Sequence, residues 1–92
     1  MPILNNHFTI AESTRVAIAS ADNMPQRVIV HEADHSESTT VFLGNATVDN
    51  TNGLHLHPAD TIELVIRPGD VLYAYSSQGA PVLHVLQIQN ND

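Results

Sequence analysis

The sequence contains no cysteine and no lysine, and its only basic side chains apart from histidine are Arg15, Arg27 and Arg67. Without cysteine, the 92 residues can form no disulfide and no thiolate metal site. Ten acidic residues give a formal net charge of −7. Binding to nucleic-acid phosphates or to anionic membranes depends on clustered lysine and arginine, so both kinds of partner are excluded.

Long apolar runs are also missing. No segment approaches the ~20 apolar residues that a transmembrane helix requires. The N-terminal stretch MPILNNHFTIAESTR has neither a basic start nor a long apolar run. No secretion signal is therefore expected within it.

Helical periodicity is absent from almost all of the chain, and short segments of alternating apolar residues take its place. Asn, Asp, Gly and Pro separate these segments and favour turns. The predicted strands are Ile3–Ile10, Thr14–Ala19, Gln26–His31, Thr40–Leu43, Thr61–Ile66, Val71–Ser76 and Val82–Gln89, with a weak eighth at either Thr47–Val48 or Leu54–Leu56. Seven or eight short strands at this spacing predict an all-β protein, a small antiparallel β-sandwich of jelly-roll type.

A chain of 92 residues has room for one domain, so residues 1–92 are expected to form a single β-sandwich. Residues 1–10 precede the main alternating segments and are interpreted as an N-terminal arm or an edge strand. A sandwich of this size without disulfides has modest stability, which association would reinforce. An arm that adds to a neighbour's sheet edge would provide such association.

The alternation also predicts which side chains are buried. Val28, Val30, Val41 and Leu43 are the expected core, because alternate residues of a strand share one face. The opposite faces carry apolar residues as well, and two explanations stay open: turns of the same chain cover them, or they form an oligomer interface. The candidate interface residues are Ile3, Leu4, Phe8, Phe42, Val65, Tyr73, Tyr75, Leu86 and Ile88.

Catalytic motifs are lacking. The stretch from Thr39 to Ser76 holds no nucleophile beside a base and no phosphate-binding loop. The run from His31 to Ser36 supplies His, Asp and Ser but neither a nucleophile elbow nor glycines for an oxyanion hole. We therefore predict no enzymatic activity, no catalytic residue and no cofactor.

Histidine, by contrast, is abundant, with six in the chain. In a strand, His55 and His57 would point the same way and could meet one metal, and Glu63 follows six residues later. An HxH with a later Glu resembles part of the pattern of the metal-binding cupins. Pro58 follows His57 directly, however, and no histidine comes soon after the turn Pro68-Gly69-Asp70, because His84 lies later, inside a different strand. We therefore favour solvent-facing histidines and predict no metal, with His55, His57 and Glu63 as the candidate ligands of the cupin-like alternative.

The order of the β motifs carries a second resemblance. The motifs are RVIVH at 27–31, TVFLG at 40–44, GLHL at 53–56, TIEL at 61–64, GDVLYA at 69–74 and VLHVL at 82–86. This series resembles small β-sandwich proteins of tailed-bacteriophage virions, of the head decoration (cement) type. The chain departs from their pattern at His31-Glu32, where asparagine is usual, and at Phe42, where tyrosine is common.

The resemblance implies a non-enzymatic structural protein of the virion, made in the host cytoplasm. The expected function is capsid decoration, with the major capsid protein or another virion protein as partner. It also implies a homo-oligomer, with a trimer favoured because decoration proteins often occupy local threefold axes. The alternatives are a tail or neck component, or a carbohydrate- or receptor-binding module that uses Tyr73, Tyr75 and the loop Asn45–Asn52.

Overall fold

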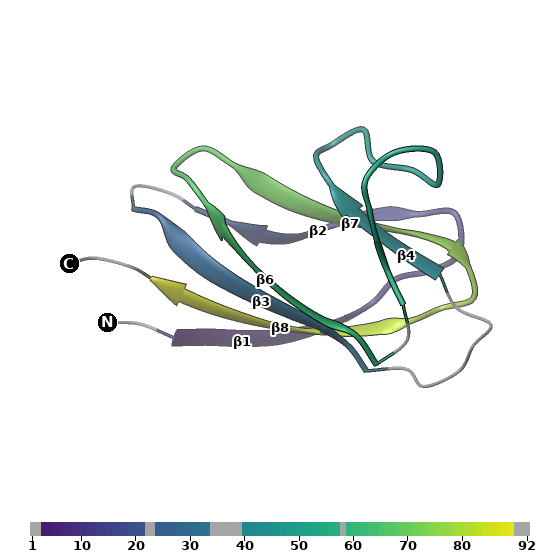
Figure 1. The fold of residues 1–92 in the computed structure, drawn as a ribbon, viewed down its shortest axis with the longest axis horizontal. Coiled ribbons are helices and arrows are strands. Elements are labelled where there is room, and N and C mark those ends of the chain that lie inside the picture. The colour runs from purple at the N-terminus through teal and green to yellow at the C-terminus, as the bar shows by residue number, and fades with distance from the viewer. Residues whose placement is uncertain (1–2, 22–23, 34–39, 58, 90–92) are drawn as a thin grey trace.

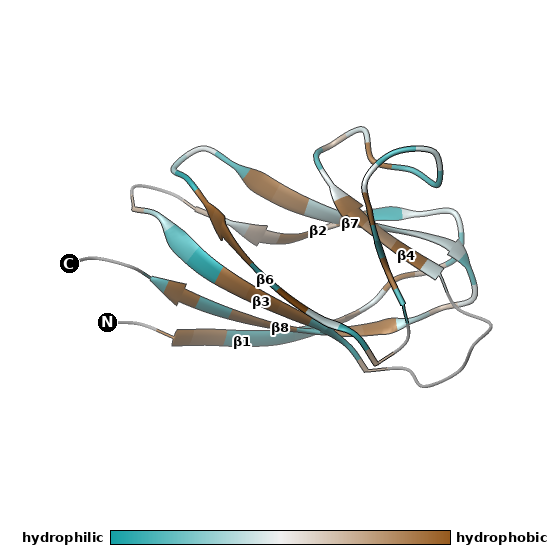
Figure 2. Cartoon of the chain, in the orientation of Figure 1, coloured by the Kyte–Doolittle hydropathy of each residue, from teal (hydrophilic) through white to brown (hydrophobic). Residues whose placement is uncertain are grey.

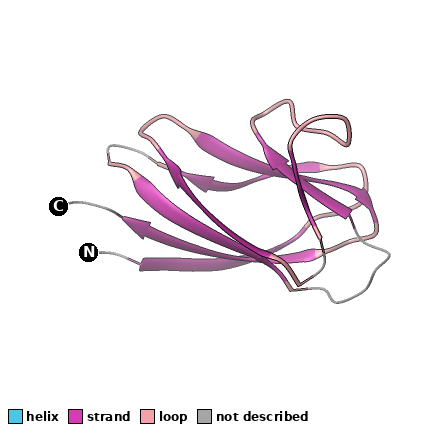
Figure 3. Ribbon diagram, in the orientation of Figure 1, coloured by secondary structure: helices cyan, strands magenta, loops and turns pink. Residues whose placement is uncertain are grey.

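The computed structural model describes residues 3–21, 24–33, 40–57 and 59–89, and strands and connecting loops make up all of this part (Figures 1 and 3). The eight strands are β1 (Ile3–Thr9), β2 (Arg15–Ser20), β3 (Gln26–Glu32), β4 (Thr40–Gly44), β5 (Leu54–Leu56), β6 (Thr61–Ile66), β7 (Val71–Gln78) and β8 (Val82–Gln89). No described helix is long and apolar enough to cross a membrane.

The strands form two four-stranded antiparallel sheets. The first sheet has the order β1-β8-β3-β6 and the second has the order β2-β7-β4-β5. Strand 1 thus pairs with 8, 2 with 7, 3 with 6 and 4 with 5, as in a long two-stranded ribbon folded onto itself. This is the strand order of a jelly roll, so the predicted fold class is confirmed.

The predicted strands agree with the observed ones to within two residues at their ends. The eighth strand is Leu54–Leu56, whereas the other candidate, Val48, lies in the loop between β4 and β5. Strand β7 continues beyond the predicted end because Gln78 still pairs with Thr40 of β4. Residues 3–9 form an edge strand that pairs with β8 of the same chain.

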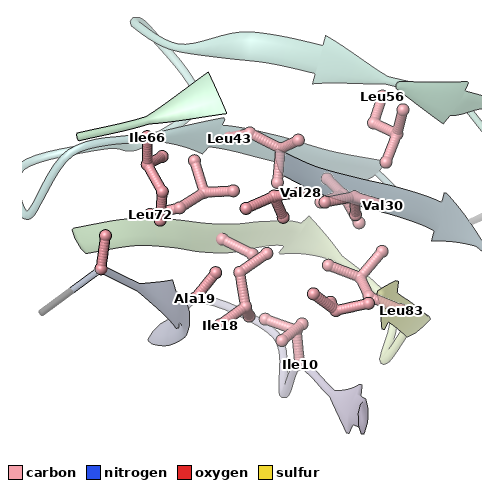
Figure 4. Packing of buried hydrophobic residues seen from close by; sticks show 14 residues of the cluster. Ile10, Ile18, Ala19, Val28, Val30, Leu43, Leu56, Ile66, Leu72 and Leu83 are labelled. Carbon is pink, nitrogen blue, oxygen red and sulfur yellow. The ribbon is translucent and has the colours of Figure 1, made fainter. Parts of the chain in front are cut away.

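The core lies between the sheets, and the predicted core residues Val28, Val30, Val41 and Leu43 are all buried in it. Figure 4 shows how their side chains meet those of the neighbouring strands. The remaining buried members of the cluster are Ile10, Ile18, Ala19, Ala21, Leu56, Ile66, Leu72, Ala74, Leu83 and Val85. The alternation of apolar and polar residues along the strands is visible in Figure 2.

One polar contact joins the two sheets near the last residue of β2. There Gln87 of β8 is 7% exposed, and its Nε2 donates to the carbonyl oxygen of Ser20 on β2 at 2.5 Å. This bond places β2 across from β8. The outermost strand of the first sheet, β1, therefore extends to the side of the β2–β8 contact.

Candidate functional site

The outer face of the first sheet carries an apolar surface that the described strands leave uncovered. Its members follow from the register: Ile3, Ile88, Arg27 and Val65 lie in one row across the four strands. The next row is Asn5, Leu86, Ile29 and Glu63. Ile3 is 59% exposed and Val65 is 58% exposed. Four of the candidate interface residues, Ile3, Val65, Leu86 and Ile88, thus share one continuous face.

One ion pair lies among these apolar residues. Arg27 Nε and Glu63 Oε2 are 2.9 Å apart, and both side chains are about half exposed. The charges of Arg27 and Glu63 cancel, so the face has no local net charge although the chain has a formal net charge of −7. Of the other described acidic residues, Glu12, Asp49, Asp60 and Asp70 lie outside the eight strands, and Glu32 is buried at the end of β3. An apolar patch with few charged side chains is typical of the core of a protein–protein interface.

Three histidines from three strands form the third row of the same face. His7 of β1 opposes His84 of β8, which opposes His31 of β3. The ring centroids of His7 and His84 are 6.2 Å apart, those of His31 and His84 are 6.5 Å apart, and both pairs meet edge to face. The row ends at Thr61, whose hydroxyl oxygen lies 2.8 Å from Nδ1 of His31. An open hollow of ≈ 320 Å³ lies over these rings.

Two candidate interface residues face the other way. Leu4 and Phe8 of β1 oppose Gln87 and Leu83, which point inward, so both belong to the inner face of the first sheet. Phe8 is half-buried and packs against the core. Leu4, which opposes Gln87, is 53% exposed although it faces inward. Its apolar surface is thus incompletely covered within one copy of the chain.

The outer face of the second sheet carries an aromatic row. Arg15 opposes Tyr75, Tyr75 opposes Phe42, and Phe42 opposes His55. The Phe42 and His55 rings stack at 4.8 Å between centroids, and the Arg15 guanidinium lies 5.9 Å from the Tyr75 centroid. Tyr75 and Phe42 are half-buried, so contacts within this chain already satisfy much of their apolar surface.

The β4–β5 loop, residues 45–53, covers part of that second face. Val48 is fully buried in it, and its Cγ2 would lie 3.0 Å from a Cβ added to Gly44 on the outward side of β4. Arg15 Nε donates to the carbonyl oxygen of Val48 at 2.7 Å and so ties the loop to β2. Two explanations were open for apolar residues on the outer faces: cover by turns of the same chain, or an oligomer interface. For this part of the second sheet, a turn of the same chain provides the cover.

The carbohydrate alternative falls on a hollow beside this loop. Tyr73, Asn45 and Asp70 line an open depression of ≈ 430 Å³ together with backbone of the β6–β7 turn. An aromatic ring with amide and carboxylate groups is suitable for a sugar, but Tyr73 is half-buried and Tyr75 lies in the next row along the sheet. The two tyrosines thus do not form one exposed platform, and the glycan hypothesis stays a prediction.

The candidate metal ligands are separated by the fold. The imidazoles of His55 and His57 are close, with centroids 4.1 Å apart, but His55 also stacks on Phe42. His57 Nδ1 lies 3.4 Å from Asp60 Oδ2. Glu63 belongs to the first sheet, where it pairs with Arg27. Within the described ranges, no group of three such residues is arranged to hold a metal ion.

Asp34, His35 and Ser36 of the imagined hydrolytic set lie outside the described residues. His31, the remaining member, belongs to the histidine row. Sequence reasoning missed that row because three separate strands contribute to it. The sequence showed only that each of the three histidines lies within a predicted strand.

Comparisons with known proteins define the fold and leave the function open. No protein-family model and no curated protein matches the sequence. Among solved structures, the chain is similar to one from Bacillus endospore appendages, which form a novel family of disulfide-linked pili. The TM-score is 0.61 with 8% sequence identity, over 98% of this chain and 87% of that chain. At this identity the likeness shows a shared β-rich fold.

Proposed function

We propose that the protein is a non-enzymatic structural subunit that decorates a bacteriophage capsid. The observation that carries the proposal is the outer face of the first sheet, which is apolar, locally uncharged and uncovered on an otherwise acidic chain. Such a face fits a protein partner. The jelly-roll fold agrees with a virion role, since viral capsid proteins use it widely, although the fold also hosts other functions.

The mechanism is mass action. A protein that binds the assembled shell and has little affinity for its separated subunits stabilises the shell in proportion to the logarithm of its occupancy. The exposed side chain of Val65 and the half-buried side chains of Ile88 and Leu86 would make the apolar contact with the major capsid protein. The Arg27–Glu63 pair would supply polar contacts that fix orientation.

Shell binding tests this role. Shells of the major capsid protein from the same phage genome are mixed with wild-type protein, with Val65→Asp, and with Val71→Asp as the control. Val71 is also an exposed valine, but it lies on the second sheet. We expect wild type and Val71→Asp to co-sediment with shells and to raise their rupture temperature, and Val65→Asp to do neither. Shells that rupture at the same temperature with and without wild-type protein would overturn the proposal.

The second candidate is a subunit of a surface filament. The fold likeness to the endospore appendage chain, which extends over nearly all of both chains, favours it. These 92 residues contain no cysteine, so they cannot supply the disulfide links named for those pili. Negative-stain electron microscopy of concentrated protein separates the two candidates, because a pilus subunit forms filaments alone and a decoration protein requires shells. The neighbouring genes provide a further discriminator: a major capsid gene favours decoration.

A further inference from the structure

Strand β1 is an exposed edge strand without the features that usually prevent strand–strand association. Natural edge strands carry charged residues, proline or bulges, or are very short. β1 reads ILNNHFT, with no acidic residue, lysine, arginine or proline. Its seven residues pair with β8 in an unbroken register from Ile3↔Ile88 to Thr9↔Val82. Its free side therefore presents a regular row of backbone N–H and C=O groups.

The other three edge strands each have such a feature. β2 has a register shift between Ala17 and Ala19 and carries Arg15 at its start. β5 has only three residues. β6 carries the charged side chain of Glu63 at its centre. The contrast singles out β1 as the edge that is open to another strand.

The second sheet leaves this edge accessible. β2 lies across from β8, as the bond from Gln87 to Ser20 shows. Beside that bond, Asn6 of β1 lines an open hollow of ≈ 380 Å³ together with Ala17 and Val71. Leu4, on the inner face of β1, is about half exposed at the same margin. A strand that adds to β1 would cover both the free backbone groups and part of this margin.

We propose that β1 pairs antiparallel with β1 of a second copy, about a twofold axis that passes between the Asn6 residues of the two copies. A twofold axis perpendicular to the sheet keeps the inner faces of the two copies on the same side. Opposed residues must therefore both be even-numbered or both be odd-numbered. A centre at Asn6 is the register that pairs all seven residues of β1. The two first sheets then join into one continuous eight-stranded sheet. Twofold dimers of this self-complementary kind are the commonest homo-oligomers.

The side chains of β1 are complementary in this register. On the inner face, Leu4 opposes the partner's Phe8, which covers the apolar surface that Leu4 exposes within one copy. On the axis, Asn6 opposes the partner's Asn6, and two amides can exchange hydrogen bonds. On the outer face, Asn5 opposes the partner's His7, again a donor with an acceptor. At the ends of the pairing, Ile3 opposes the partner's Thr9 on the outer face, so no like charges meet anywhere in this register.

Charge substitution at the axis tests this dimer. The full chain is measured by light scattering over a concentration series around the micromolar range. We expect a mass that rises toward two chains for the wild type. Asn6→Lys places two like charges opposite each other and should weaken association about tenfold or more. Leu54→Lys, an equal charge at an exposed residue of the edge strand β5 in the second sheet, should leave association unchanged.

Two further variants make the test specific to the register. Asn6→Asp alone should dissociate like Asn6→Lys, and an equimolar mixture of the two should recover a dimer, because Lys then opposes Asp. Asn6→Cys should oxidise to a cross-linked dimer, since opposed strand residues lie about 4.5–5.5 Å apart, within disulfide range. Asn5→Cys alone should not cross-link, but mixed with His7→Cys it should.

A monomer at all concentrations overturns the proposal, and so does a trimer that Asn6→Lys leaves intact. Cross-linking of Asn5→Cys alone that matches Asn6→Cys would also overturn the twofold register. Circular dichroism of each variant confirms folding, which should be retained because Asn5, Asn6 and His7 are exposed. The inference rests on β1 alone, so failure of capsid binding leaves it standing.

Discussion

Arg15 and Val48, which lie 33 positions apart in the sequence, are joined by a 2.7 Å hydrogen bond from the guanidinium Nε to the carbonyl oxygen. The bond ties the edge strand β2 to the β4–β5 loop across the outer face of the second sheet. The same guanidinium lies 5.9 Å from the centroid of Tyr75. One side chain thus holds the loop over the aromatic row.

Replacing Arg15 should therefore destabilise the fold. Arg15→Met keeps the apolar stem and removes the donor, and we expect a loss of about 1–2 kcal/mol in the free energy of unfolding, as for a hydrogen bond from a charged group. Arg67→Met is the control, because Arg67 is exposed and lies in the β6–β7 turn. Urea unfolding monitored by circular dichroism measures both. Equal losses for the two variants would show that the Val48 contact contributes nothing.

Two glycines in different turns, Gly53 of the β4–β5 loop and Gly69 of the β6–β7 turn, separate the effect of backbone strain from that of packing. Gly53 has φ 99°, and a Cβ there would lie 2.5 Å from Val48 Cγ2 and 2.8 Å from the Leu43 carbonyl oxygen. Gly69 has φ 90°, but an added Cβ would meet nothing within 4 Å. Gly69→Ala should cost about 1–2 kcal/mol from the left-handed backbone alone. Gly53→Ala should cost about 1–3 kcal/mol more, because a packed side chain must move. Equal melting temperatures for the two variants would contradict this arrangement of Val48.

Asp49 should make the loop sensitive to acid. The hydroxyl and backbone N–H of Thr51 both donate to its carboxylate, and these bonds lower the pKa of Asp49 below its usual value. A carboxyl whose pKa is lower in the folded state stabilises the fold above its unfolded pKa of about 3.9, and this contribution is lost as the pH falls through the folded pKa. Thr51→Val should therefore raise the pKa of Asp49, which an NMR titration of its carboxyl carbon measures. An unchanged titration midpoint would contradict the role of the Thr51 hydroxyl.

The sequence was sufficient for the strands and for much of the core, and insufficient for the pairing of distant strands. Val28, Val30, Val41 and Leu43 were predictable because alternation within one strand is a local property. The row of His7, His84 and His31 depends on a register between segments about fifty residues apart or more, which no local pattern specifies.

The inward placement of Leu4 and Phe8, by contrast, had a readable signal. The odd residues of β1 include asparagine and histidine, whereas the even ones begin and end with leucine and phenylalanine. Alternation alone thus favoured the even residues as the inner face. The burial of Val48 and its bond to Arg15 had no such signal, because a loop can fold over either side of its strands.

The last prediction concerns metal. His55 is stacked on Phe42, His57 is beside Asp60, and the carboxylate of Glu63 is held by Arg27 on the opposite sheet. Bringing Glu63 to the two histidines would require the sheets to rearrange and the ion pair to break. We therefore expect protein dialysed against chelator and then exposed to zinc to retain far less than one metal per chain, with an unchanged melting temperature. A ratio near one would contradict this. His55→Ala and His84→Ala would then show which cluster holds the ion, because His84 is the central member of the other histidine group.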